Sequence, residues 1–380
     1  MSSSELERRV RKALRELDSD GLRRKFRSPS GIDLSSNDYL GLATHPLVKQ
    51  KMAEAVMDEG CGSTGSRLLR GNRDSFVRVE QRFADFKGSE SALYFGSGYA
   101  ANVGVLSTFI ERHDLVFSDE HNHASIIDGI RLSRAKRTKY PHCDVDRVAH
   151  LLREAPSNVQ KFLVTESLFS MDGDFAPLVQ YADLCRETGT SLIVDEAHAV
   201  GIYGKRGSGY AEHTGTTDGV FLTINTAGKA LGVAGAFVAG PHWAIDFLIQ
   251  RARPFIFSTA PPPPVAAALE ASLDVIRDEP ERRIQLLAKS GELRRFLREG
   301  GLDISSSGSQ IIPVILGDNQ RATHAAEELQ HEGYDVRAMR PPTVPVGTAR
   351  LRVTVNVQIE ESTLRSFALA LGKVCSGVYS

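Results

Sequence analysis

The sequence is poor in cysteine and in uncompensated charge. Four cysteines occur among 380 residues, at positions 61, 143, 185 and 375, and none of them stands in a Cys-x-x-Cys pair. This scatter argues against a disulfide framework and a cysteine-based zinc site, and it favours a reducing compartment, the cytoplasm. The 46 basic and 47 acidic side chains leave a net charge of −1. Such a balance argues against partners that bind through bulk charge, namely nucleic acids and membrane surfaces.

Long apolar segments are also missing. No uninterrupted apolar run is long enough to span a bilayer, and the first residues are polar and charged, unlike a signal peptide. The sequence does have enough apolar residues for a sizeable hydrophobic core, because 41% of its 380 residues are hydrophobic. A chain of this size suits a large domain together with a smaller one.

Apolar, β-prone runs alternate with helical stretches between about residues 50 and 240. The strands that we expect there are 92–95, 114–117, 162–165, 191–194, 219–224 and 235–239. Alternation of this kind indicates a mostly parallel sheet that is covered by helices. Ahead of it, Leu6, Val10, Leu14 and Leu17 recur at helical spacing and predict an amphipathic helix.

The last third of the chain predicts a smaller α+β domain. After the rigid break at Pro261–Pro264, helices are expected at 265–276, 282–298 and 321–332, and strands at 310–316 and 349–355. The organisation that follows is an N-terminal helix and arm at residues 1–45, a large α/β domain at 46–275 and a small α+β domain at 276–380.

Lys229 is the residue that most strongly indicates chemistry. It stands in Thr226-Ala-Gly-Lys-Ala-Leu-Gly232, where its neighbours are small or apolar. A lysine is usually a solvated surface charge. Burial beside a cofactor, however, would lower its pKa and free the amine as a nucleophile and base. This is the setting of a lysine that holds an aldehyde cofactor as a Schiff base, which points to pyridoxal 5′-phosphate (PLP).

An apolar strand at residues 191–194 delivers Asp195 and, three residues later, His198. A carboxylate that faces the pyridine nitrogen of PLP would keep that nitrogen protonated, and the ring would then accept electrons. Asp195 fits this role, and His198 is placed to bond the phenolic oxygen of the ring.

The same Asp195-Glu-Ala-His198 run is also the Walker B form of a helicase ATPase. That interpretation requires a Walker A loop elsewhere in the chain. The Gly228-Lys229 pair fails as one, because Thr223 stands in place of the first glycine and Ala230 in place of the magnesium-binding hydroxyl residue. The sequence therefore disfavours the ATPase.

A glycine-containing turn provides a candidate phosphate site. Gly96 and Gly98 follow a predicted strand and open a predicted helix, whose free N–H groups and dipole would favour an anion. A tight turn needs glycines for its own geometry, so a structural role is the alternative. Thr226, three residues before Lys229, would add a hydroxyl to the phosphate.

His123 ends the polar cluster Asp119-Glu-His-Asn-His123. A His-x-His pair beside acids suggests a metal site, but no third ligand is evident in the sequence. The alternative is a flat aromatic ring that stacks on the cofactor, and His123 suits that role. No metal is therefore expected.

Together these residues resemble the α-oxoamine synthase family of fold-type-I PLP enzymes over nearly the whole chain. The motifs that carry the resemblance are Ser36-Asn-Asp-Tyr-Leu-Gly41, Gly62-Ser-Thr-Gly-Ser-Arg67, Gly96-Ser-Gly-Tyr-Ala-Ala-Asn102, His123-Ala-Ser125, Thr165-Glu-Ser-Leu-Phe-Ser-Met-Asp-Gly173, Asp195-Glu-Ala-His198, Thr226-Ala-Gly-Lys229 and Arg350-Leu-Arg352. The resemblance implies an α/β fold whose large domain has a mostly parallel seven-stranded sheet and whose smaller C-terminal domain is α+β.

Within the family, the run Phe257-Ser-Thr-Ala-Pro-Pro262 favours one branch. Its enzymes condense L-alanine with a pimeloyl thioester, carried by CoA or by a carrier protein, in biotin biosynthesis. The alternatives are a sister enzyme that condenses glycine with acetyl-CoA, a PLP aminotransferase, and a non-enzymatic protein that retains the fold. The intact set Lys229, Asp195, His198 and Arg352 argues against the last of these.

The resemblance also implies a role for each site residue. The catalytic set is Lys229, which forms the covalent imine, Asp195 at the pyridine nitrogen, His198 at the ring oxygen and His123 stacked on the ring. Further cofactor contacts are expected from Gly98, Tyr99 and Thr226 at the phosphate, Ser258 or Thr259 from a second subunit, and Ser170 near the ring. Substrate contacts are expected from Asn37, Glu166, Arg352 and Arg23. A site shared in this way implies a homodimer.

Overall fold

The computed structural model describes residues 4–377; residues 1–3 and 378–380 of the expected outer domains lie outside the described part. The chain forms two compact units. The larger one comprises residues 37–170 and 174–285, and the smaller one comprises the chain up to Ser36, residues 171–173 and the chain from Leu286 onward. The boundary near residue 285 falls inside helix α12 (Glu281–Glu299). The three-part division expected from the sequence stays a prediction.

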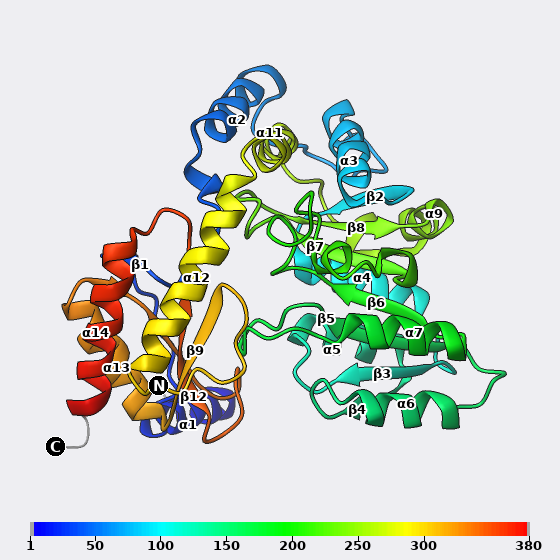
Figure 1. The fold of residues 1–380 in the computed structure, drawn as a ribbon. Helices are drawn as coiled ribbons and strands as arrows, with labels where there is room; N and C mark the ends of the chain where they lie inside the picture. The colour runs from blue at the N-terminus through cyan, green and yellow to red at the C-terminus, as the bar shows by residue number, and fades with distance from the viewer. Residues whose placement is uncertain (1–3, 378–380) are drawn as a thin grey trace. The chain divides into compact units, whose positions relative to one another are not determined.

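One seven-stranded sheet forms the centre of the larger unit, in the order β2-β8-β7-β6-β5-β3-β4 (Figure 1). β8 pairs antiparallel with both β2 and β7, and the remaining neighbours are parallel. The expected mostly parallel sheet is confirmed. The strands are β2 (Ser91–Phe95), β3 (Leu115–Asp119), β4 (Lys136–Tyr140), β5 (Lys161–Glu166), β6 (Ser191–Asp195), β7 (Leu222–Thr226) and β8 (Ala236–Gly240).

Helices pack on both faces of this sheet, and successive residues of a strand point to opposite faces, so the residues of a central strand are buried on one side or the other. In β6, Ile193 packs in a cluster with residues of α4 (Gly98–Phe109), α5 (Ala124–Ser133) and α9 (His242–Arg251). Its neighbours Leu192 and Val194 pack in a second cluster with residues of α6 (Val145–Glu154) and α7 (Leu178–Thr188). The central strands therefore read as continuous apolar runs in the sequence. The unit also contains η1 (Leu42–Thr44), α2 (Pro46–Glu59), α3 (Asp74–Lys87), α8 (Tyr210–His213), η2 (Thr217–Gly219), α10 (Arg253–Ile256) and α11 (Pro264–Asp278).

The sequence analysis predicted no strand at β4. Its residues, Lys-Arg-Thr-Lys-Tyr, carry three cations, and Lys136, Arg137 and Lys139 are exposed. β4 forms the edge of the sheet beside β3, so it has one neighbour only. Edge strands commonly carry charge, which discourages pairing with another chain. The apolar pattern that revealed the inner strands is absent for this reason.

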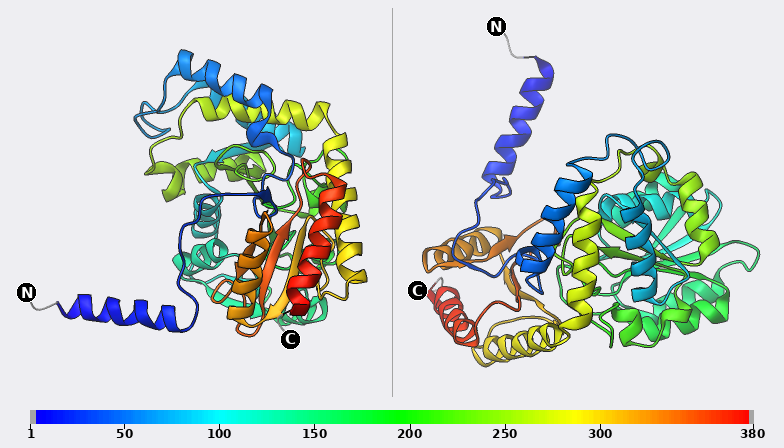
Figure 2. Two further views of the ribbon diagram at one scale, coloured as in Figure 1. Left: turned by 90° about the vertical axis from the view of Figure 1, so that its left-hand side faces the viewer. Right: turned by 90° about the horizontal axis from the view of Figure 1, so that it is seen from above.

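The smaller unit contains an antiparallel sheet in the order β11-β12-β9. Its strands are β9 (Ile311–Gly317), β11 (Arg337–Met339) and β12 (Ala349–Thr354), with α13 (Asn319–His331) and α14 (Glu361–Gly377) beside them (Figure 1). A short parallel pair, β1 (Ile32–Asp33) and β10 (Tyr334–Asp335), attaches the N-terminal arm. The predicted amphipathic helix is confirmed as α1 (Glu5–Ser19), but it buries none of its residues and projects from the rest of its unit (Figure 2). No helix between residues 4 and 377 is long and apolar enough to cross a bilayer.

An ion-pair clamp holds the ends of β3 and β4 against the loop before α7. His142 Nδ1 lies 3.0 Å from Asp119 Oδ1, and His142 Nε2 lies 2.9 Å from Asp174 Oδ2. Asp119, His142 and Cys143 have the spacing of metal ligands, but the two carboxylates already occupy both ring nitrogens. Burial disfavours the charged imidazole, yet the bonds to Asp119 and Asp174 outweigh it and raise the pKa of His142 to about 12. The clamp is therefore cationic at its centre.

We predict that His142→Gln lowers the free energy of unfolding by about 3 kcal/mol near pH 6, since it leaves partly buried carboxylates without their cation. The pKa of His142 rises from 6.5 to about 12 on folding. Its stabilisation is thus complete below pH 6.5 and declines as the pH rises toward 12. Urea unfolding at two pH values measures the difference, with the exposed His150→Gln as matched control. A gap between wild type and His142→Gln that widens at alkaline pH would contradict the cationic clamp.

Candidate active site

The residues expected to carry the chemistry gather at the carboxyl ends of the parallel strands. Glu166 ends β5, Asp195 ends β6 and Thr226 ends β7, and Glu166 stands directly opposite Asp195 in the sheet. His198 and Lys229 follow β6 and β7 by three residues each. Open α/β sheets bind their ligands at this edge, and the structure confirms that the sequence motifs meet there.

A chain of hydrogen bonds holds the amine of Lys229. Lys229 Nζ lies 2.8 Å from His198 Nε2, and His198 Nδ1 lies 2.6 Å from the hydroxyl of Tyr39. That hydroxyl donates to Asn37 Oδ1 at 3.0 Å. An amide oxygen only accepts, so the Tyr39 oxygen is left to accept from the Nδ1–H of His198. His198 Nε2 is then the acceptor for the lysine amine.

Tyr39 was not assigned a role from the sequence, although it lies within the Ser36–Gly41 motif. Its side chain is fully buried. The residue spacing in that motif gives no sign that the tyrosine reaches a histidine 159 positions later. Only the tertiary structure reveals this contact.

Asp195 is held by two donors. Its Oδ2 accepts from Asn102 Nδ2 at 2.6 Å, and its Oδ1 accepts from the backbone N–H of Ala197 at 2.8 Å. Asn102 also donates to Ser125 Oγ at 3.0 Å, and that hydroxyl lies 2.7 Å from His123 Nδ1. One buried amide therefore positions both the expected ring carboxylate and the expected stacking histidine. The sequence analysis missed this role of Asn102, which closes the Gly96–Asn102 motif.

Glu166 is a buried acid with an unusual protonation state. Its Oε1 accepts from the backbone N–H of His123 at 2.7 Å. Burial, with repulsion from Asp195, raises the pKa of Glu166 to about 8, although Lys229 opposes this. Partial burial lowers the pKa of His123, and Lys229 adds to that effect while Asp195 opposes it. Near neutral pH the site thus presents a protonated Glu166 and an uncharged His123.

The expected phosphate residues also meet. A Cβ on Gly98 would lie 2.5 Å from Thr226 Oγ1, so a side chain at this position would fill the space beside that hydroxyl. Gly98 and Tyr99 are the first two residues of α4. The side chain of the N-cap residue, Ser97, accepts a hydrogen bond from the backbone N–H of Ala100. The hydroxyl of Tyr99 donates to Asp128 at 2.5 Å. The first N–H groups of a helix beside a threonine hydroxyl form a cradle that suits a phosphate.

The larger unit therefore contains groups that fit each end of PLP. Lys229 offers an amine for the aldehyde, Asp195 a fixed carboxylate for the ring nitrogen, and Gly98 with Thr226 a cradle for the phosphate. Ser170 is half-buried in the same unit, whereas Ser258 and Thr259 are exposed after α10. Their expected contacts with the cofactor stay predictions.

Two expected substrate residues belong to the smaller unit. Arg352 is buried on β12, where its Nη1 donates to Thr354 Oγ1 at 3.0 Å. Arg23 follows α1 and pairs with Asp18 at 2.7 Å. Asn37, by contrast, lies in the larger unit and takes part in the chain of bonds to Lys229. The substrate roles of these three residues stay predictions.

Comparison with known sequences points to one group of enzymes. The 8-amino-7-oxononanoate synthase of Anaeromyxobacter dehalogenans (strain 2CP-1) is 46% identical over 375 residues, which cover 95% of this chain and 94% of the relative. The enzyme of the same name from Geobacter sulfurreducens is 43% identical over 377 residues, which cover 95% of this chain and 96% of the relative. These relatives confirm the resemblance to the α-oxoamine synthases.

Solved structures and a family model extend the comparison. Serine palmitoyltransferase from S. paucimobilis, solved with a bound PLP–myriocin aldimine, superposes with a TM-score of 0.92 at 28% identity over 99% of this chain and 100% of that one. The 8-amino-7-oxononanoate synthase of Francisella tularensis gives a TM-score of 0.80 at 28% identity over 92% and 99%. The expected fold-type-I architecture is confirmed. Because the family model for aminotransferase class I and II matches residues 29–371, the chain belongs to that family.

Proposed function

We propose that this chain catalyses the PLP-dependent decarboxylative condensation of L-alanine with a pimeloyl thioester. The products are 8-amino-7-oxononanoate, CO2 and the free thiol, in biotin biosynthesis. The observation that carries the proposal is the amine of Lys229, held 2.8 Å from His198 Nε2 in the unit that also holds Asp195 and the Gly98–Thr226 cradle. The names of the relatives described above support the same reaction.

When it is bound, PLP supplies two things: an aldehyde that reacts with amines, and a pyridinium ring that withdraws electrons from the Cα of the amino acid whose amine has reacted. Lys229 would hold the aldehyde, and Asp195 would keep the ring nitrogen protonated. Gly98 and Thr226 would hold the phosphate. Asn102 fixes the orientation of the Asp195 carboxylate through its 2.6 Å bond, so the carboxylate need not reorganise.

When its amine is no longer joined to the aldehyde, Lys229 is the proposed base that removes the Cα proton of alanine and later returns a proton to that carbon. Its hydrogen bond to His198 orients the amine, and Tyr39 fixes the tautomer of His198. The new bond joins the alanine Cα to the thioester carbonyl carbon. The C–S bond breaks, the thiol leaves, and the alanine carboxylate departs as CO2.

Asn37 and Arg352 are proposed to bind the carboxylate of the amino acid, since a guanidinium and an amide donate charge-assisted hydrogen bonds to it. A homodimer with shared sites is proposed as the working form. Its support is the exposed segment at Ser258 and Thr259, next to a Phe257 side chain that is 71% exposed. A cytoplasmic location stays a prediction of the sequence.

A substrate panel tests the reaction. We expect purified, yellow protein to release thiol and CO2 from L-alanine with pimeloyl-CoA or a pimeloyl carrier protein. Mass spectrometry should identify 8-amino-7-oxononanoate. Glycine with acetyl-CoA is the matched comparison, and a preference for it would assign the chain to the sister reaction. A keto acid formed without loss of thioester would identify an aminotransferase.

Glu166→Gln tests the protonated acid. Folding raises the pKa of Glu166 from 4.5 to about 8, so the folded state binds a proton that the unfolded state releases. Wild-type stability should therefore fall, relative to the neutral variant, as the pH rises from 4.5 to 8. The limit is about 1.4 kcal/mol per pH unit for one proton. Urea unfolding of cofactor-free protein at both ends of that range measures the change. If the stability of wild type rose relative to that of the variant with increasing pH, a raised pKa of Glu166 would be excluded.

A further inference from the structure

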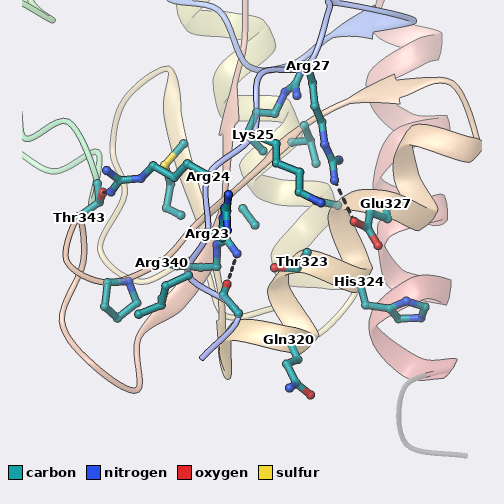
Figure 3. A pocket seen from close by; sticks show the side chains of 18 of the residues that line it. Arg23, Arg24, Lys25, Arg27, Gln320, Thr323, His324, Glu327, Arg340 and Thr343 are labelled. Carbon is teal, nitrogen blue, oxygen red and sulfur yellow. Dashed lines mark hydrogen bonds and ion pairs between the residues drawn. The ribbon is translucent and has the colours of Figure 1, made fainter. Parts of the chain in front are cut away.

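The surface and the interior of this protein differ in what a charged side chain costs. In a pocket of the smaller unit, about 570 Å³ in volume, Arg23, Arg24 and Lys25 are exposed, so water solvates their charges (Figure 3). In the larger unit, by contrast, Lys87 and Glu196 form an ion pair whose side chains are 5% and 0% exposed. The buried pair needs a reason that the exposed cations do not.

The ion pair ties the loop after β6 to two other parts of the larger unit. Lys87 is the last residue of α3, and its Nζ lies 2.5 Å from Glu196 Oε2 and donates to the backbone oxygen of Ser208 at 2.6 Å. The other carboxylate oxygen, Oε1, accepts from the backbone N–H of Ala211 at 2.8 Å. The backbone approaches so closely that a Cβ at Gly209 would lie 2.0 Å from Glu196 Oε2. One carboxylate therefore joins α3, the loop after β6 and the segment that enters α8.

Stability alone does not account for a buried ion pair. Two charges lose their hydration when they are buried, and apolar side chains of similar size often stabilise a protein as well or better. The larger unit already has apolar clusters on both faces of its sheet. The location of the pair offers another reason, because Glu196 stands between Asp195 and His198 in the sequence.

Glu196 is the centre of the backbone turn that presents both of these active-site residues. Its N–H donates to the backbone oxygen of Ile224 on β7 at 2.7 Å, and its own backbone oxygen accepts from the N–H of Ala199 at 2.9 Å. The side-chain bonds of Glu196 add a third point of attachment, which opposes rotation of the residue. A rotated Glu196 would displace the carboxylate of Asp195 and the ring of His198 together.

We propose that the ion pair between Lys87 and Glu196 positions the active site. It fixes the turn that orients the Asp195 carboxylate and that holds His198 Nε2 2.8 Å from Lys229 Nζ. Lys87 and Glu196 act through these residues, so they are positioning residues and not catalytic ones. The inference rests on the proposed function only for the substrates of a turnover assay, because the binding of PLP tests it independently.

Titration of cofactor-free protein with PLP, followed by absorbance, tests the proposal. Glu196→Asp keeps both charges but shortens the side chain by one methylene group, so the protein should fold while the turn shifts. Its dissociation constant for PLP should rise about tenfold, as expected when one charge-assisted contact is misaligned. The matched control is Arg82→Met, which removes another ion pair of α3, with Asp274 at 2.5 Å, and should bind PLP like wild type. An unchanged dissociation constant in Glu196→Asp would overturn the proposal.

A neutral double variant, Lys87→Met with Glu196→Gln, separates positioning from stability. Each single change leaves one buried charge without its partner and should lower the free energy of unfolding in urea, whereas the double change leaves none and should recover much of it. The dissociation constant for PLP should stay about tenfold higher in the double variant, because methionine cannot bond the new amide to α3. If the affinity for PLP recovered together with stability, the pair would be merely structural.

The visible absorbance of PLP joined to Lys229 provides a signature that a change in fold stability alone would not move. A carboxylate at Asp195 would keep the ring nitrogen protonated, and that positive charge lowers the pKa of the imine. In Glu196→Asp the displaced carboxylate would hold the ring proton less firmly. The visible band should therefore titrate at higher pH than in wild type, and titration at the wild-type pH would contradict the positioning role.

Turnover separates the failure of this inference from that of the proposed function. With L-alanine and pimeloyl-CoA, kcat of Glu196→Asp should fall about tenfold while KM for alanine stays near that of wild type, because the pair positions the base and not the substrate. A rise in KM without a fall in kcat would contradict this role. Condensation with unaltered PLP affinity in the variants would remove the positioning role alone. Weakened PLP affinity in variants of a protein that does not condense these substrates would remove the proposed reaction alone.

Discussion

The hydrogen bond between Lys229 Nζ and His198 Nε2 is the interaction on which the candidate site depends. It keeps the amine half-buried and oriented, and it exists because β6 and β7 are neighbours that end at the same edge of the sheet. Tyr39 and Asn37 then determine which nitrogen of His198 is free to accept. Without this hydrogen bond the amine would lose its fixed orientation, because the lysine side chain is flexible.

The same edge of the sheet brings two acids close together, and this proximity raises the pKa of one of them. Glu166 and Asp195 face each other on adjacent strands, so burial and repulsion from Asp195 raise the pKa of Glu166 to about 8. Asp195 keeps its acceptor role because Asn102 and the Ala197 N–H donate to it. Burial and charge repulsion thus set the protonation state of Glu166, whereas two hydrogen-bond donors fix the orientation of Asp195.

Local pattern and tertiary contact account for what the sequence could and could not predict. The inner strands were predictable because burial on both faces makes them apolar, whereas β4 was missed because an edge strand can be charged. Lys229, Asp195 and His198 stood out by their setting. Tyr39 and Asn102 did not, because their partners are 159 and 93 positions away.

Reductive trapping tests the central claim that Lys229 carries the cofactor. Borohydride added to protein incubated with PLP should fix the cofactor on the peptide that contains Lys229, as measured by mass spectrometry. Lys229→Ala should lose this label and about 10²–10⁴-fold in turnover, the range of a missing acid–base group. The exposed Lys205→Ala should keep both. A colourless protein whose Lys229 stays unlabelled, or a fully active Lys229→Ala, would contradict the account.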